Sequence, residues 1–364
     1  PFPSPCSRRR RLRATVQDLH FSWDGRPFNI SVSIGMVEVA NVGMTLEEVL
    51  RAADVACYMA KEKGRNRIHF HSEGDTALRE RFGEMAWVQR LHAALDQNRF
   101  RLHAQEIAPL RDDIPEQGAH IEILLRLTDE DGSFVTPQSF IPAAERYGLM
   151  PAIDRWVVRD TLATLAARRA DPHATPISTC AINLSGATFG DETFLGFMRE
   201  QFAAHAIVPE TICLEITETS AIANLSEAMR FIADLRGLGC RFALDDFGSG
   251  MSSFAYLKHL PVDYLKIDGS FVKDMLDDRI DRAMVEMIHH IGKVTGKRTI
   301  AEFVESEGII DALKAIGVDY AQGYAIARPQ PFDATTVLRG NRSERDATAD
   351  GWETLARTLR RKAS

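Results

Sequence analysis

Residues 241–250 read Arg-Phe-Ala-Leu-Asp-Asp-Phe-Gly-Ser-Gly, an apolar run that ends in two adjacent carboxylates and a glycine-bearing loop. The run predicts a buried strand, and the glycines after it leave the loop open to a ligand or able to move. Neighbouring carboxylates repel each other, so at neutral pH either a pKa is raised or a metal ion is bound. Asp245 and Asp246 therefore indicate a divalent-metal site at the end of a strand.

Eight apolar runs, this one included, divide the chain from Phe100 onward. They span 100–108, 120–127, 178–184, 211–216, 240–245, 263–267, 298–304 and 318–324. Helical patterns separate most of them, at 152–169, 191–205, 222–237, 271–296 and 306–316. Strands that alternate with helices pair in parallel beneath them, and about 250 residues is the size of a TIM (β/α)8 barrel. The first connection is short and carries Gly118, so an antiparallel first strand, and hence a modified barrel, is left open.

Four segments are expected along the chain of 364 residues. Residues 1–72 form a small partial α/β segment, with strands at 28–39 and 66–71 and a helix from about 45 to 63. Residues 73–98 form a charged helical linker, residues 99–340 the α/β barrel, and residues 341–364 a polar tail.

The bulk composition limits the partners. A formal net charge of −7 argues against duplex nucleic acid. No apolar run approaches the length of a membrane span. Five scattered cysteines without a C-x-x-C pair favour reduced thiols in a cytoplasmic protein. A membrane tether in sequence upstream of this chain is left open.

Polar residues interrupt the apolar runs close to their carboxyl ends, at the rim where barrel enzymes place their chemistry. A single such residue is well explained by a core hydrogen bond or a salt bridge, but a series over consecutive strands is not. The series consists of Glu122, Asn183, Glu215, Asp245, Asp246, Lys266, Asp268, Glu302, Glu305 and Gln322.

The ligand types narrow the choice of metal. Carboxylate and amide oxygens, without Cys or His, suit Mg²⁺, Mn²⁺ or Ca²⁺ better than zinc. Asp245 beside Asp246 is suited to bridge two ions, which is the usual arrangement for phosphodiester cleavage. Lys266 lies inside an apolar run, where it can position the attacking water or neutralise charge on phosphate. The alternative for Lys266 is a structural ion pair with Asp268.

These residues, in this order, resemble the EAL family of cyclic di-GMP phosphodiesterases over residues 86–332. The motifs that carry the resemblance are Ile-Glu122-Ile-Leu-Leu-Arg126, Phe140-Ile-Pro-Ala-Ala-Glu145, Asn183-Leu-Ser185, Glu215-Ile-Thr-Glu218, Asp245-Asp246-Phe-Gly-Ser-Gly250, Lys266-Ile-Asp268, Glu302-Phe-Val-Glu305 and Gln322-Gly-Tyr324.

The resemblance implies in-line hydrolysis of one phosphodiester of cyclic di-GMP to linear pGpG, with two Mg²⁺ or Mn²⁺ ions. It implies Glu122, Asn183, Glu215 and Asp245 as ligands of the first ion, and Asp245, Asp246 and Glu302 as ligands of the second. It also implies that Lys266 holds the hydrolytic water and that Glu302 is a candidate general base. Glu305 and Gln322 support the metals, while Gln105, Arg126 and Asp268 are expected to bind substrate.

The resemblance further implies that Glu218 anchors the loop after Asp246. That loop is linked in the family to both substrate binding and dimer contacts, so a homodimer through the barrel is expected.

Three positions depart from the family pattern. Ile123 stands in the middle of the signature Glu-Ala-Leu, and the period of two places it outward, against the helices. Glu106 replaces a usual proline. Phe303 replaces a usual glycine directly after Glu302, where a phenyl ring could shift the strand end or narrow the site.

The N-terminal segment resembles the second half of a GGDEF diguanylate cyclase domain. The matching stretches are Phe21-Ser-Trp23-Asp-Gly25, Val32-Ser33-Ile34-Gly35, Ala53-Asp54-Val-Ala-Cys-Tyr58-Met-Ala60-Lys61 and Gly64-Arg65-Asn66-Arg67. The GGDEF signature is absent, so we expect no cyclase activity from this chain. Half a sheet leaves strand edges unpaired, and we expect the segment to be unstable alone.

Two alternatives to a cyclic di-GMP phosphodiesterase remain open. One is a silent EAL-type receptor, which binds the dinucleotide without cleaving it. The other is an unrelated barrel enzyme with oxygen-ligated metals and a different substrate.

Overall fold

The computed structural model describes residues 87–338, with gaps at 112, 115–117, 130–131 and 251–253, and short stretches between residues 15 and 70. The chain divides into two compact units, residues 1–89 and 90–364, and each is described by itself. The finer boundaries expected from the sequence stay a prediction.

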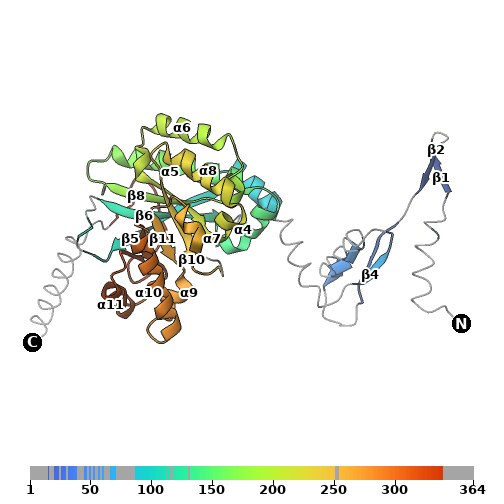
Figure 1. Ribbon diagram of the computed structural model, residues 1–364. Helices are drawn as coiled ribbons and strands as arrows, with labels where there is room; N and C mark the ends of the chain where they lie inside the picture. The colour runs from blue at the N-terminus through green and yellow to red at the C-terminus, as the bar shows by residue number, and fades with distance from the viewer. Residues whose placement is uncertain are drawn as a thin grey trace, which may run out of the picture. The chain divides into compact units, whose positions relative to one another are not determined.

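The second unit is a closed barrel of eight strands, which confirms the predicted fold (Figure 1). Its strands are β5 (Phe100–Pro109), β6 (Ala119–Thr128), β8 (Ile177–Asn183), β9 (Ile212–Thr217), β10 (Arg241–Phe247), β11 (Tyr264–Ile267), β12 (Arg298–Ala301) and β13 (Tyr320–Gln322). Strand β5 is antiparallel to both of its barrel neighbours, β6 and β13, whereas the other pairs are parallel. The reversed first strand is therefore real, and the barrel is a modified TIM barrel.

Helices cover the outside of the barrel, with α5, α6 and α8 over one part of it and α9, α10 and α11 over another (Figure 1). They are α4 (Pro137–Arg146), α5 (Met150–Arg169), α6 (Phe194–His205), α7 (Glu218–Ala223), α8 (Leu225–Arg236), α9 (Gly269–Lys273), α10 (Arg279–Val294) and α11 (Glu307–Ile316). Two short strands, β7 (Phe134–Val135) and β14 (Gln330–Pro331), extend the sheet. Within the described part of the chain, no helix is both long and apolar enough to cross a bilayer.

Three details differ from the sequence predictions. The expected helix 222–237 divides into α7 and α8 at Asn224, whose backbone leaves the helical region. The expected helix 271–296 divides into α9 and α10, and the Asp278 side chain caps the start of α10. The expected strand 298–304 ends at Ala301, because Phe303 adopts a left-handed conformation with φ +51° that an extended strand does not allow.

An apolar layer lies in the interior of the barrel, one inward position before the polar residues of the rim. Its members come from seven different strands: Ile107, Ala181, Cys213, Ala243, Tyr264, Ile300 and Tyr320. Because successive strand residues alternate in direction, the next inward positions toward the carboxyl ends carry the polar residues of the candidate site. The layer thus separates the two ends of the barrel.

The first unit contains two small two-stranded sheets. Strands β1 (His20–Trp23) and β2 (Arg26–Asn29) form an antiparallel hairpin, while β3 (Ile34–Met36) pairs in parallel with β4 (Ile68–Phe70). The expected single strand 28–39 is therefore wrong, since its two halves have different partners. The described residues between 46 and 60 are helical. The predicted instability of this unit alone stays a prediction.

Candidate active site

Lys266 of β11 lies at the centre of the carboxyl-end rim and contacts four carboxylates. Its Nζ atom lies 2.8 Å from Glu215, 2.8 Å from Glu302, 3.1 Å from Asp245 and 3.3 Å from Glu122. The lysine side chain is 1% exposed. The alternative prediction, a structural ion pair between Lys266 and Asp268, is wrong, because the ammonium contacts these four other carboxylates instead.

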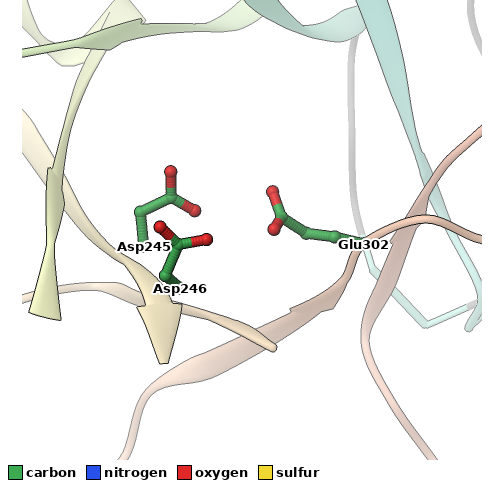
Figure 2. Close-up of side chains that lie close together, drawn as sticks. All are labelled: Asp245, Asp246 and Glu302. Atoms are coloured by element: carbon green, nitrogen blue, oxygen red, sulfur yellow. The ribbon is translucent and has the colours of Figure 1, made fainter. Parts of the chain in front are cut away.

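Asp245, Asp246 and Glu302 form a group that can hold a cation. Figure 2 shows the two aspartates at the end of β10 with the Glu302 carboxylate facing them. One oxygen from each residue lies within 4.8 Å of the others. Asp246 turns away from the strand with φ +52°, and this left-handed backbone sends consecutive carboxylates to the same side.

The rim contains more carboxylates than positively charged groups, and burial together with this imbalance shifts their pKa values. Burial raises the pKa of Glu302 to about 8, although Lys266 opposes the shift. Burial and then the Asp245 charge raise the pKa of Asp246 to about 6, and burial raises that of Glu215 well above its usual value. Although burial lowers the pKa of Lys266, the surrounding carboxylates raise it well above the ordinary lysine value. One ammonium therefore balances only part of the carboxylate charge.

The donor set fits divalent cations. Glu215 Oε1 is buried and makes no hydrogen bond within the described residues, so an acceptor is left without a donor in a dry interior. Hard carboxylate oxygens are the ligands that Mg²⁺ and Mn²⁺ prefer. Asn183 is the amide of the predicted ligand set, and its Nδ2 donates to Glu122 Oε1 at 2.6 Å. The residues predicted as metal ligands are thus brought to one rim.

Two glutamines complete a hydrogen-bonded network around Glu122. Gln322 Nε2 donates to Glu122 Oε2 at 2.6 Å and lies 3.2 Å from Gln105 Oε1. Gln105 Nε2 donates in turn to the carbonyl of Ala327. Burial raises the pKa of Glu122, but Lys266 and the amide donors Gln322 and Asn183 lower it by more, so the net shift is downward. Glu122 is therefore held as a carboxylate with a fixed orientation.

Glu218 accepts hydrogen bonds at the start of the loop after Asp246 and beyond its end. Its fully buried carboxylate accepts hydrogen bonds from Gly248 N at 2.9 Å and from the Tyr256 hydroxyl at 2.5 Å. A Cβ added at Gly250 would be in ordinary van der Waals contact with the same carboxylate, at 3.5 Å. Tyr256 was not predicted from the sequence, and it lies ten residues beyond Asp246 without a motif to mark it.

Three expected site residues lie outside this network. Glu305 is exposed, beyond the end of β12. Asp268 accepts a hydrogen bond from Ser270 N and so caps helix α9. Arg126 is half-buried at the end of β6, two inward positions beyond Glu122, and its guanidinium donates to the Leu125 carbonyl. Their predicted roles are neither contradicted nor tested by these positions.

A second residue missed from the sequence is Asp154 of α5, which holds the loop that follows Asn183. Its Oδ2 accepts from Ser185 N, Ser185 Oγ and Thr188 Oγ1. No sequence motif marked this aspartate, which is followed directly by Arg155 in the helix.

The departures from the family pattern have different structural consequences. Ile123 is 2% exposed, as expected for an outward packing position. Phe303 is 60% exposed, and its ring covers Gly269 so closely that a Cβ there would lie 2.1 Å from Phe303 Cδ2. The left-handed φ of +51° at Phe303 explains the usual glycine, which reaches this conformation without steric cost.

Comparison with known proteins agrees with this geometry. The chain is 41% identical over 305 residues to cyclic di-GMP phosphodiesterase PdeB of Shewanella oneidensis, covering 84% of this chain and 35% of that protein. It is 34% identical over 326 residues to cyclic di-GMP phosphodiesterase PdeF of Escherichia coli, covering 88% of this chain and 42% of that protein. It therefore spans about two fifths of the length of these relatives.

Among solved structures, a phosphodiesterase in complex with c-di-GMP, PaMucR, superimposes with a TM-score of 0.62 at 30% identity, covering 68% of this chain and 98% of that one. The diguanylate cyclase GGDEF domain family matches residues 5–67, as the N-terminal resemblance indicated. The EAL domain family matches residues 88–329, which is most of the chain. With its rim of carboxylates and its reversed first strand, the chain belongs to the EAL domain family.

Proposed function

We propose that this chain hydrolyses cyclic di-GMP to linear pGpG. The observation that carries the proposal is the carboxylate rim centred on Lys266, in which every expected metal-ligand position keeps an oxygen ligand. The names of the two relatives, both cyclic di-GMP phosphodiesterases, supply the substrate class.

Two Mg²⁺ or Mn²⁺ ions are the proposed cofactors. Glu122, Asn183, Glu215 and Asp245 would hold the first, and Asp245, Asp246 and Glu302 the second. When bound, such ions supply a nucleophile at neutral pH and neutralise charge on the phosphate. The excess of carboxylates over positive charge at this rim supports the assignment.

Lys266 is the proposed residue that orients the attacking water and balances charge on the phosphate. Its ammonium is desolvated, and its contacts with Glu215 and Glu302 at 2.8 Å fix its position before substrate arrives. Preorganised charge of this kind acts strongly because water is excluded. Glu302, at the same Nζ atom, is the proposed acceptor of the water's proton, a role that competes with tight metal coordination.

Gln105, Arg126 and Asp268 are the proposed contacts with the dinucleotide. Gln105 is tied to Glu122 through Gln322, so a substrate contact at Gln105 is relayed to a metal ligand. Arg126 supplies the planar fork that suits a phosphate. Glu305 and Gln322 are proposed to support the metal ligands, and the loop held by Glu218 is proposed to contribute to a homodimer.

The test is incubation of the purified protein with cyclic di-GMP and Mg²⁺ or Mn²⁺, followed by chromatography for pGpG. We expect pGpG to form, to stop with EDTA and to return with either metal. Tight binding of cyclic di-GMP without pGpG would favour the silent receptor instead. Hydrolysis of another phosphodiester, with none of cyclic di-GMP, would favour a different metal-dependent barrel enzyme.

A further inference from the structure

A polar cavity of about 610 Å³ lies at the opposite end of the barrel from the carboxylate rim. It is lined by the first residues of three neighbouring strands, Arg241 of β10, Tyr264 of β11 and Arg298 of β12. At their other ends, the same strands carry Asp245 and Lys266, and β12 ends directly before Glu302. The cavity is therefore distinct from the candidate active site.

The cavity concentrates positive charge in a chain whose net charge is −7. Four cationic side chains line it, from Arg236, Arg241, Lys297 and Arg298, against the single carboxylate of Asp263. That carboxylate forms a salt bridge with Arg236 at 2.5 Å. Within the described residues, Arg241, Lys297 and Arg298 form no salt bridge. Burial acts to lower the pKa of Lys297 and of Arg298, whereas the Asp263 charge acts to raise the former and the Asp319 charge acts to raise the latter. Positive charge still exceeds negative charge in the lining, with four cations against one carboxylate.

The two guanidinium groups keep hydrogen-bond donors for a ligand. Arg241 Nη1 donates to Thr179 Oγ1 at 3.0 Å and approaches the Tyr264 hydroxyl at 3.4 Å. Arg298 Nη1 donates to the Tyr320 hydroxyl at 2.8 Å. All three partners are neutral oxygens, and in the described residues the Nε and Nη2 groups of both arginines make no hydrogen bond. A guanidinium edge of this kind binds phosphate oxygens in a bidentate manner.

Lys297 adds a third donor beside the arginines. Its Nζ donates to the carbonyls of Leu260 at 3.2 Å and Val262 at 3.0 Å, which holds the ammonium in place and leaves one N–H. Burial lowers the pKa of Lys297. An anion in the cavity would offset this cost of burying a charge.

We propose that this cavity binds a small phosphate-bearing anion with two or more negative charges, such as a nucleoside triphosphate or pyrophosphate. The site lies between Arg241, Lys297 and Arg298, and the cavity volume is within the range of ordinary small-molecule sites. A purely structural role for the arginines would need only the Tyr and Thr oxygens. It would not require three cations without a salt-bridge partner to line one cavity.

The test is isothermal titration calorimetry of the full chain with ATP and, separately, with pyrophosphate, both in EDTA. Without metal, the carboxylate rim repels anions, so heat of binding reports on the basic cavity. We expect saturable binding that weakens as salt rises. Equal affinity for the two ligands would assign the site to the phosphates alone, whereas tighter ATP binding would assign it to a nucleotide.

Arg241→Gln and Arg298→Gln are each expected to weaken binding about ten- to hundredfold, because each removes a charge-assisted contact. Lys297→Gln serves the same purpose if an arginine variant fails to fold. The matched control is Arg282→Gln, since Arg282 is exposed on α10 and pairs with Glu286 at 3.0 Å. Absence of binding to the wild-type chain at millimolar ligand, or equal weakening by the control, would overturn the proposal.

Discussion

Replacing Lys266 with Met tests the centre of the candidate active site. Methionine keeps most of the aliphatic volume but removes the ammonium that contacts four carboxylates at 2.8–3.3 Å. The side chain is 1% exposed, so water does not replace the lost charge easily. The variant should therefore separate the chemical role of Lys266 from its role in balancing the rim.

The expected loss of pGpG formation is about a hundred- to a thousandfold, the usual effect of deleting one preorganised group that stabilises developing charge. The metal-free variant should lose about 3–5 kcal/mol of unfolding free energy at pH 8.5, because buried carboxylates lose their partner. The loss should be smaller at pH 5.5. Glu302, whose pKa is raised to about 8, and Asp246, whose pKa is raised to about 6, are largely protonated there and need no counter-charge.

Metal binding should survive the substitution. Removing a cation from the rim lowers the repulsion that a divalent ion meets, so Mn²⁺ affinity measured by calorimetry should stay the same or rise. The assays are chromatography of pGpG, calorimetry with Mn²⁺, and urea unfolding in EDTA at both pH values.

Lys314→Met is the matched control, since Lys314 is exposed on α11. Hydrolysis within about threefold of wild type would refute the role of Lys266. An inactive variant that no longer binds Mn²⁺ would also refute it, because the lysine would then act by assembling the metal site.

Three further variants and one linkage experiment test the rest of the site. Glu122→Gln keeps the side-chain volume but removes the ligand charge and one of two acceptor oxygens, which bind Asn183, Gln322 and Lys266. The formation of pGpG should therefore fall at least about a hundredfold and Mn²⁺ should bind more weakly by calorimetry; near-native rates would contradict the two-metal scheme. Phe303→Gly relieves a left-handed backbone that costs about 1–2 kcal/mol for a non-glycine residue, while the lost ring is 60% exposed. The turnover rate should stay unchanged or rise, and a large loss would show that the ring supports the site. Tyr256→Phe removes a hydroxyl donor from a buried carboxylate, and urea unfolding should show a loss of about 1.5–3 kcal/mol; an unchanged midpoint would mean that this hydrogen bond does not hold the loop. Mn²⁺ binding at pH 7 should release protons, because Glu302 is mostly protonated before the metal enters. The release, measured by calorimetry in buffers of different ionisation enthalpy, should decrease as pH rises through 8, and a constant value would contradict the raised pKa.

The barrel could be predicted from local patterns, because its strands are apolar runs of nearly the observed length and its helices follow the 3.6-residue period. The polar side chains near the carboxyl ends of the strands could also be predicted, since inward strand positions recur with a period of two. Gly118 and the short first connection were enough to suggest that the first strand runs antiparallel to the second. The sequence could not mark where β12 ends, because that depends on the left-handed backbone of Phe303.

The contacts among the polar residues depend on the folded barrel and could not be predicted from the sequence. Lys266 lies two positions from Asp268 in sequence, yet its partners come from four other strands or strand ends, which meet only when the barrel closes. Tyr256 and Asp154 act through contacts across the fold that no local spacing encodes. The basic cavity also depends on closure, because Arg241 and Arg298 are separated by 57 positions in sequence and come together at one end of the sheet. Local periodicity fixes the direction of a side chain along its own strand, whereas its neighbours are set by strand order and register.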